Sequence, residues 1–155
     1  MQVATGIWLQ KKLFLIYQNR NILGINTYNI LRKQKGDVSM KQLVNYILEN
    51  NGATYNPRQK ELVFTGYACS GIKENETIIN GKVTENDLVE YINKFQADFT
   101  GNDKAMVGVW YNTENDKTYL DTSFVHDNLQ SALDSAKELQ ELAIFDLNRL
   151  EEIWL

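Results

Sequence analysis

The stretch AMVGVWYNTENDKTYLDTSF, residues 105–124, decides the fold of this chain. Residues 105–111 and 117–124 are rich in β-branched and aromatic side chains, which favour strands. The five residues between them, 112–116, are all polar. Two such segments joined by a short polar loop predict a β-hairpin. An antiparallel sheet is therefore the expected centre of the fold.

A helix is expected directly after the hairpin, over residues 127–141. Asp127 with Gln130 three residues later resembles a capping box. Apolar residues recur at helical spacing and predict one buried stripe, which consists of Leu129, Ala132, Leu133, Ala136 and Leu139. Residues 142–147 predict a further strand, and residues 150–155 can add another.

Two more helices and two more strands are expected before the hairpin. Ser39 can cap a helix that ends before Gly52, and Thr84 can cap a second one. Residues 61–68 and 77–79 are rich in strand-forming side chains. The predicted order is α-β-β-α-β-β-α-β. This order indicates an α+β fold, a largely antiparallel sheet with helices packed on one face.

The charge of the chain is unevenly distributed. The whole chain has a net charge of -4. Residues 1–39 hold six basic residues and one acidic residue, a net charge of +5, whereas the other 116 residues hold ten basic and nineteen acidic residues, a net charge of -9. Such an asymmetry predicts parts with different roles. We expect a basic prefix over residues 1–39 and a compact acidic α+β domain over 40–155, with an internal seam near 100–104.

Two interpretations of the prefix stay open. Lys35-Gly36-Asp37 can be encoded by a purine-rich stretch that resembles a bacterial ribosome-binding site, and Met40 follows closely, so the prefix can be a mis-annotated leader. The alternative is an authentic basic arm, either disordered or helical. Its longest apolar run, residues 13–17, is far shorter than the roughly 18 residues of a membrane span. The sequence predicts no membrane partner, and its single cysteine, Cys69, favours a cytoplasmic location.

The last third of the chain contains four short motifs that form one pattern. Its residues are Val107-Gly108-Val109-Trp110-Tyr111, Tyr119-Leu120-Asp121, Ala143-Ile144-Phe145-Asp146-Leu147 and Glu151-Glu152-Ile153. This pattern, over residues 105–155, resembles small uncharacterised proteins of bacteriophages and prophages. The resemblance implies a compact ββαβ unit and a phage accessory protein in the cytoplasm of a bacterial host. It implies no catalytic residues.

Few side chains offer catalytic or metal-binding chemistry. Cys69 and His126 are the only residues of their types, which excludes a zinc site built from cysteines and histidines. They leave one enzymatic alternative, a small thiol-dependent hydrolase in which Asp121 or Asp127 orients the imidazole. The simpler interpretation is a buried apolar cysteine and a histidine that precedes a helix. Asp121 and Asp146 could also meet as a carboxylate pair, although Asp146 can equally end its strand by accepting backbone N–H groups.

Nucleotide-binding chemistry has no support in the sequence. Neither the GxxxxGK[ST] nor the GxGxxG pattern occurs. A domain with a net charge of -9 also repels phosphate, so residues 40–155 are not expected to bind nucleic acid directly. We expect no catalytic residue, no cofactor and no metal.

The acidity is the strongest functional indication. Asp134, Glu138 and Glu141 recur at helical spacing on one face, and Asp127 precedes the helix. Solubility alone explains many acidic surfaces. The functional interpretation is that these four residues bind a basic surface of a host or phage protein, for instance the nucleic-acid groove of a host defence protein that they would inhibit.

A third alternative is a structural role. The chain can be an oligomer subunit whose exposed aromatic side chains, such as Trp110 or Tyr111, seal a contact between copies. Because successive side chains of a strand point to opposite faces, only one of these two neighbours is expected to face the core.

Overall fold

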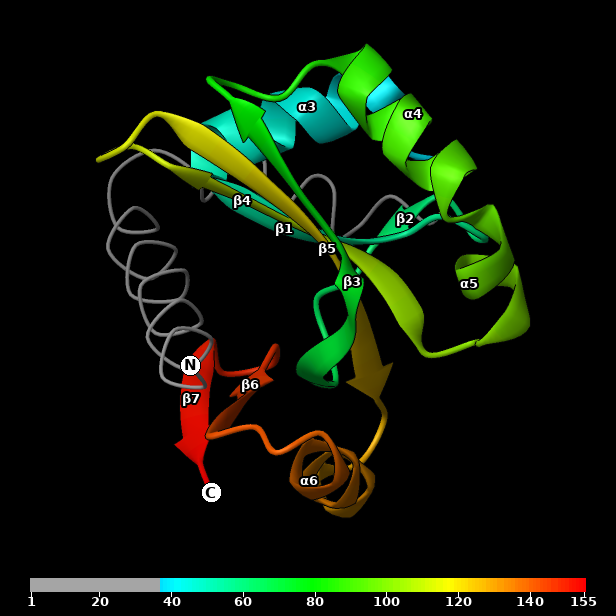
Figure 1. Cartoon of the computed structure of the whole chain (residues 1–155), viewed down its shortest axis with the longest axis vertical. Coiled ribbons are helices and arrows are strands. Elements are labelled where there is room, and N and C mark those ends of the chain that lie inside the picture. The colour runs from blue at the N-terminus through cyan, green and yellow to red at the C-terminus, as the bar shows by residue number, and fades with distance from the viewer. Residues whose placement is uncertain (1–36) are drawn as a thin grey trace.

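The computed structural model describes residues 37–155. The predictions for residues 1–36, a leader or a basic arm, lie outside the described residues. Within them, seven strands form one antiparallel sheet in the order β2-β1-β4-β5-β3-β6-β7 (Figure 1). The strands are β1 (Gly52–Asn56), β2 (Glu61–Leu62), β3 (Tyr67–Asn80), β4 (Ala105–Asn112), β5 (Lys117–His126), β6 (Ala143–Asp146) and β7 (Glu151–Trp154). The helices are α3 (Met40–Asn50), α4 (Glu85–Lys94), α5 (Gln96–Gly101) and α6 (Leu129–Glu138). The predicted α+β class and antiparallel sheet are confirmed.

The predicted central hairpin is confirmed. β4 pairs with β5 from Ala105 opposite Phe124 to Asn112 opposite Lys117. The loop closes with Asp116 at a positive φ of 51°, a conformation that aspartate tolerates better than most residues. All eight residues of β4 are buried, so both faces of this strand are covered. The hairpin therefore forms the middle of the sheet.

The structure contains more elements than the predicted order. β1 pairs with β4 and was not predicted, because GATYN has neither alternation nor a run of strand formers. The predicted second helix is divided into α4 and α5. Residues 61–68 contribute the short β2 and the start of β3, and the predicted strand over 77–79 is the end of the same β3.

A bulge interrupts β3. Between the pairs Ile72–Thr122 and Thr77–Leu120, β3 has three more residues than β5. Asn75, which is buried, holds the bulge in place, because its amide donates to Thr122 Oγ1 at 3.1 Å and to Asp98 Oδ2 at 2.9 Å. β3 pairs with β5 along its length and, at its first two residues, also with β6 on its other edge.

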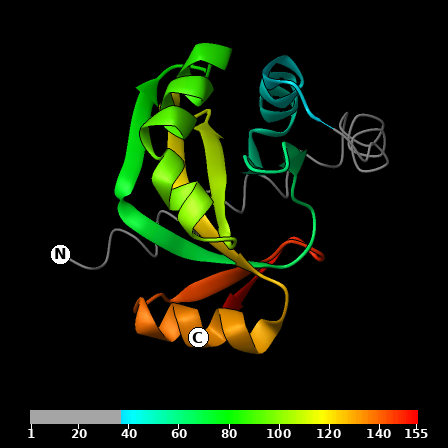
Figure 2. The same cartoon turned by 90° about the vertical axis from the view of Figure 1, so that its right-hand side faces the viewer.

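All four helices cover the same face of the sheet. The largest hydrophobic cluster packs α3, α4 and α5 on β1, β4 and β5, with Leu43, Leu88, Phe99, Val107 and Leu120 among its buried members. A second cluster packs Ala132 and Ala136 of α6 on β3 and β6. Phe124 of β5 contacts both clusters, and it points to the same side as Leu120 because it is four residues away in the strand. Figure 2 shows α4 and α5 in front of the strands and α6 at one end.

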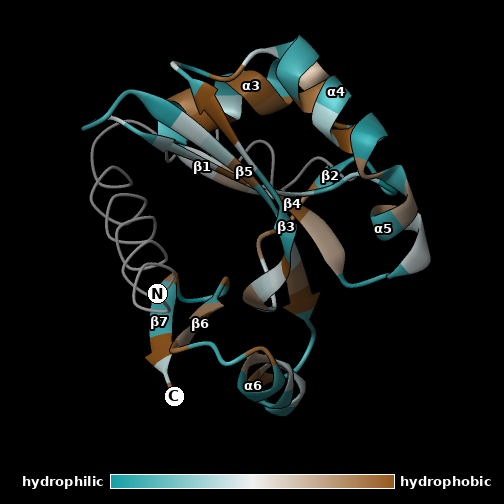
Figure 3. Cartoon of the chain, in the orientation of Figure 1, coloured by the Kyte–Doolittle hydropathy of each residue, from teal (hydrophilic) through white to brown (hydrophobic). Residues whose placement is uncertain are grey.

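Local sequence explains where the helices begin. The Ser39 hydroxyl accepts from Gln42 N at 3.2 Å, and the Thr84 hydroxyl accepts from Asp87 N at 3.2 Å. Both capping boxes are complete, so the predicted caps Ser39 and Thr84 are confirmed. The predicted cap Asp127 is wrong, because Asn128 caps α6 by accepting from Ser131 N at 2.9 Å. α3 and α4 carry apolar and polar residues side by side, as Figure 3 shows. Their apolar sides face the sheet.

Arg58, in the turn between β1 and β2, connects this turn to the segment around residues 100–104. Its guanidinium donates to the backbone carbonyl oxygens of Phe99, Asn102, Asp103 and Ala105. These carbonyls lie at the end of α5 and the start of β4, where no helical partner remains for them. The five donors of a guanidinium suit this arrangement. Arg58 thus binds the segment near 100–104, where the seam was predicted, to the turn after β1.

Candidate functional site

Three of the four predicted protein-binding residues are exposed. Asp134 and Glu138 lie on α6, and Asp127 lies just before the helix. The buried residues of α6 are Ala132 and Ala136, which face the sheet. The exposed carboxylates are therefore available to a partner.

The prediction for Glu141 is wrong, because this residue is 8% exposed. α6 ends at Glu138, and Gln140 then adopts the left-handed conformation with φ 57°. Gln140 N donates to Lys137 O at 3.1 Å and Glu141 N to Ala136 O at 2.8 Å, which is the Schellman pattern of helix ends. This turn directs Glu141 inward, where its Oε1 lies 3.6 Å from Lys73 Nζ.

Asp127 lines an open hollow of about 460 Å³ together with two more carboxylates. Glu61 of β2 and Asp103 of the loop before β4 are the other two, and Lys104 is the basic residue beside them. Three chain segments that are distant in sequence thus bring negative charge to one place. The sequence did not indicate this hollow, because Glu61 and Asp103 lie more than 20 residues from Asp127 and share no local pattern with it.

The structure brings together Cys69 and His126, the residues of the enzymatic alternative. Cys69 Sγ lies 3.7 Å from His126 Nε2 and 3.6 Å from Ser135 Oγ. Both residues are buried, with exposures of 3% and 6%. They meet because Tyr67 pairs with His126 at the start of β3, which places Cys69 two residues along the same face.

The environment of the pair favours its neutral form. Burial raises the pKa of the Cys69 thiol, the hydrogen bond that the thiol makes with Ser135 Oγ lowers it, and the Glu141 carboxylate raises it. Burial lowers the pKa of His126, as does Lys104, whereas Asp127 raises it. Among the described residues, His126 Nδ1 has no hydrogen-bond partner, so neither Asp121 nor Asp127 orients the imidazole. A thiolate nucleophile needs the opposite shifts.

Asp121 and Asp146 do not form a carboxylate pair. Asp146 Oδ1 accepts from Asn148 N at 2.8 Å and from Arg149 N at 3.2 Å, so it ends β6 as a turn-forming side chain. Asp121 Oδ1 instead accepts from the Ser123 hydroxyl at 2.5 Å on β5. The structural interpretation of Asp146 is confirmed.

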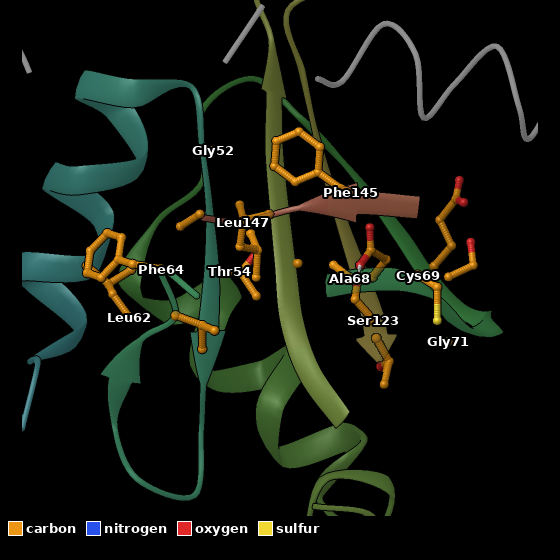
Figure 4. A pocket seen from close by; sticks show the side chains of 18 of the residues that line it. Gly52, Thr54, Leu62, Phe64, Ala68, Cys69, Gly71, Ser123, Phe145 and Leu147 are labelled. Carbon is orange, nitrogen blue, oxygen red and sulfur yellow. Dashed lines mark hydrogen bonds between the residues drawn. The ribbon is translucent and has the colours of Figure 1, made fainter. Parts of the chain in front are cut away.

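A groove lies on the other face of the sheet, the helix-free face, where Tyr46 and Asn50 of the adjoining α3 also line it. Its cavity has a volume of about 140 Å³ and a largely apolar wall. Figure 4 shows Thr54, Leu62 and Phe64 on one side, Ala68 and Ser123 on the other, and Phe145 and Leu147 between them. The groove also has charged lining residues, which are Lys73, Glu76 and Asp121. No local sequence pattern predicts this groove, because its walls come from α3 and from several strands that meet only through long-range pairing.

The floor of the groove depends on a glycine. Asp121 and Ser123 point away from the helix-covered face, since they alternate with Leu120 and Thr122 along β5. Gly108 lies opposite Asp121 in β4, and a Cβ atom there would collide with the Asp121 carboxylate and contact Ser123 Oγ at 3.0 Å. The missing side chain therefore makes room for the carboxylate.

The oligomer alternative assumes that Trp110 or Tyr111 is exposed, and this assumption is wrong. Trp110 is 1% exposed and Tyr111 is 9% exposed, so neither can seal a contact between copies. The Trp110 ring stacks on the Tyr119 ring, with the centroids 5.1 Å apart. The exposed large aromatic residue of the described chain is Trp154, at 52%.

Within residues 37–155, no group of three or more His, Cys, Asp or Glu side chains could hold a metal ion. None of the helices in this range is long and apolar enough to cross a membrane. Comparison of the chain with family models, with curated proteins and with solved structures gives no match.

Proposed function

We propose that this chain is a small accessory protein of bacteriophage or prophage type that acts by binding a basic surface of a host or phage protein. The observation that carries the proposal is the exposed acidic surface formed by Asp127, Asp134 and Glu138. All twenty acidic residues of the chain lie within residues 37–155, against ten basic ones, so this part has a net charge of -10. Complementary charge increases the rate at which two proteins associate.

The hollow beside Asp127 strengthens the proposal. Glu61 and Asp103 line it with Asp127, so a basic side chain of a partner would meet several carboxylates at once. A host protein that binds nucleic acid offers such basic surfaces, and a protein that covers them would inhibit it. A folded domain of this charge does not itself attract phosphate.

Affinity capture from infected or lysogenic bacterial cells tests the proposal, with the full chain as bait. The test variant is Asp127→Asn/Asp134→Asn/Glu138→Gln. The control variant is Glu49→Gln/Glu85→Gln/Glu114→Gln, which removes the same charge from exposed residues elsewhere. We expect the control to retain a basic partner that the test variant loses, and we expect association to slow steeply as salt rises. Equal capture by both variants would contradict the proposal.

A second candidate, a thiol-dependent hydrolase, rests on the 3.7 Å approach of Cys69 to His126. Burial and the raised pKa of the thiol argue against it. We expect iodoacetamide to alkylate folded Cys69 more slowly than the same residue in urea-unfolded protein. We also expect His126→Ala to leave the pH dependence of alkylation unchanged. Fast alkylation in the folded state that depends on His126 would favour the hydrolase.

A further inference from the structure

We propose that this chain forms a symmetric dimer in which β7 of one copy pairs antiparallel with β7 of a second copy. Within the described residues, β7 pairs only with β6 and ends the strand order of the sheet (Figure 1). The contact would join two seven-stranded sheets into one. This inference is independent of the proposed function, because Asp127, Asp134 and Glu138 lie outside β7.

The two ends of the strand order differ in what they offer to another strand. At one end, β2 has only two residues and follows a turn that contains Pro57 and Lys60. Short length, proline and lysine are means by which proteins protect an edge strand from pairing. At the other end, β7 has four residues and contains neither proline nor lysine. β7 is therefore the edge that can accept a further strand.

The backbone groups of Glu152 and Trp154 point away from β6. Leu155 N donates to Leu142 O at 3.0 Å, which continues the ladder between β6 and β7. In an antiparallel pair, residues that bond to the neighbouring strand alternate with residues that do not. Ile153 therefore bonds to β6, as Leu155 does, whereas the N–H and C=O groups of Glu152 and Trp154 are directed to the open edge.

Exposed apolar side chains gather at the same edge. Trp154 is 52% exposed, Leu155 is 48% exposed and Leu142 is 55% exposed. They are neighbours, because Leu155 bonds to Leu142 and Trp154 lies opposite Ala143 in the ladder. Single exposed apolar side chains are ordinary, but a group of them marks a contact surface.

Charge and hydrogen bonding select one register for the pair of β7 strands. With Glu152 of one copy opposite Trp154 of the other, both outward residues of each strand are used, and each of the two pairs exchanges two hydrogen bonds. Glu152 opposite Glu152 would place like charges face to face, which is destabilising. Trp154 opposite Trp154 would leave Glu152 beyond the end of the other β7. The twofold axis therefore passes beside Ile153, and the two copies of Ile153 face each other.

Sedimentation equilibrium of the full chain, over a range of protein and salt concentrations, tests the proposal. We expect a monomer–dimer equilibrium that persists or strengthens as salt rises, because salt screens the repulsion between two copies of charge -4. The proposed partner binding through the acidic residues of α6 should instead weaken with salt, so the two proposals fail separately. A chain that stays monomeric at about 1 mM, or self-association that salt abolishes, would overturn the dimer.

Variants of Glu152 test the backbone contact. Glu152→Pro removes an outward N–H, and proline is tolerated where the N–H of an edge strand faces solvent. It deletes one hydrogen bond from each of the two pairs, so the dissociation constant of the dimer should rise by roughly tenfold or more. The control Glu152→Ala removes the same charge but keeps the N–H, and it should change the dissociation constant much less. Equal values for the two variants would overturn the proposal.

Variants of Trp154 leave the backbone unchanged, which covers the case in which the proline disturbs folding. Trp154→Glu places a second carboxylate opposite Glu152 and should weaken the dimer by roughly tenfold or more, whereas Val89→Glu, on exposed α4, should not. Adding Glu152→Lys to Trp154→Glu should restore part of the affinity, since the two residues are opposite each other only in this register. Absence of this rescue would contradict the register.

Disulfide formation measures the register directly. In a Cys69→Ala background, Ile153→Cys gives each copy a single thiol, and the two thiols belong to a non-hydrogen-bonded pair with Cα atoms about 4.5 Å apart. We expect mild oxidation to cross-link this variant. Glu152→Cys in the same background should cross-link much more slowly, because its two copies are offset by two residues. No cross-link at residue 153, or an equal or faster one at residue 152, would overturn the proposal.

Discussion

The two faces of the central β4–β5 hairpin differ in what covers them. On the helix-covered face, Val107, Val109 and Leu120 pack against α3, α4 and α5 and are at most 1% exposed. On the helix-free face, Gly108, Asp121 and Ser123 form the floor of a groove. The same strands thus supply a closed apolar core and a partly polar hollow. Their alternation teaches that one hairpin can close a core on one side and leave a hollow on the other.

The largest expected effect concerns the helix-covered face. Leu120→Ala removes a fully buried side chain from the main cluster and leaves a cavity, so we expect the free energy of unfolding to fall by about 2–5 kcal/mol. Leu142→Ala is the control, because Leu142 is 55% exposed, and it should change stability by less than about 0.5 kcal/mol. Urea unfolding measures both. A loss of unfolding free energy for Leu120→Ala as small as that of the control would contradict the role of the helix-covered face as the core.

An intermediate effect is expected on the helix-free face. Gly108→Ala places a methyl group against the Asp121 carboxylate, so we expect a loss of about 1–3 kcal/mol from overpacking. The control is Gly101→Ala, where no atom lies within 4 Å of the added Cβ. In an Asp121→Ala background the cost of Gly108→Ala should shrink, which a double-mutant cycle of unfolding free energies reports. An equal loss of unfolding free energy in both backgrounds would mean that Gly108 is not required to make room for the Asp121 carboxylate.

The smallest expected effect is a pH dependence of the free energy of unfolding, and it comes from His126 at the end of the helix-covered face. Burial lowers the pKa of His126 below its ordinary 6.5. The unfolded chain therefore binds a proton more readily than the native protein, and stability should be complete above pH 6.5 and fall as the pH drops through it. His126→Gln should flatten this decline in urea unfolding between about pH 7.5 and 5.5. A decline of the same size in the variant would assign it to other groups.

The sequence predicted most of the helix-covered face. Ser39 and Thr84 cap their helices through hydrogen bonds to residues three positions away, so a short stretch of sequence contains all the necessary information. The end of α6 was not predictable in the same way. Gln140 occupies the left-handed position that glycine usually takes, and without a glycine the periodic acidic pattern predicts a helix that continues to Glu141.

Local sequence patterns do not predict the groove, for a different reason. Gly52 and Thr54 meet Trp110 and Gly108 only because β1 pairs with β4 across more than 50 residues. Cys69 and His126 were recognised as a candidate pair, and the ladder between β3 and β5 does bring them together. Their charge state, however, depends on burial, which no spacing in the sequence reveals.

The order of strands in the sheet also has a consequence for synthesis of the chain. As the chain emerges from the ribosome, β1 has only the two-residue β2 as a neighbour until β4 appears, and β3 has no neighbour until β5 appears. Such long-range pairings slow folding. During this interval the edges of β1 and β3 are open to pairing with other chains. The arrival of the β4–β5 hairpin, which fits between β1 and β3, closes both edges in one step.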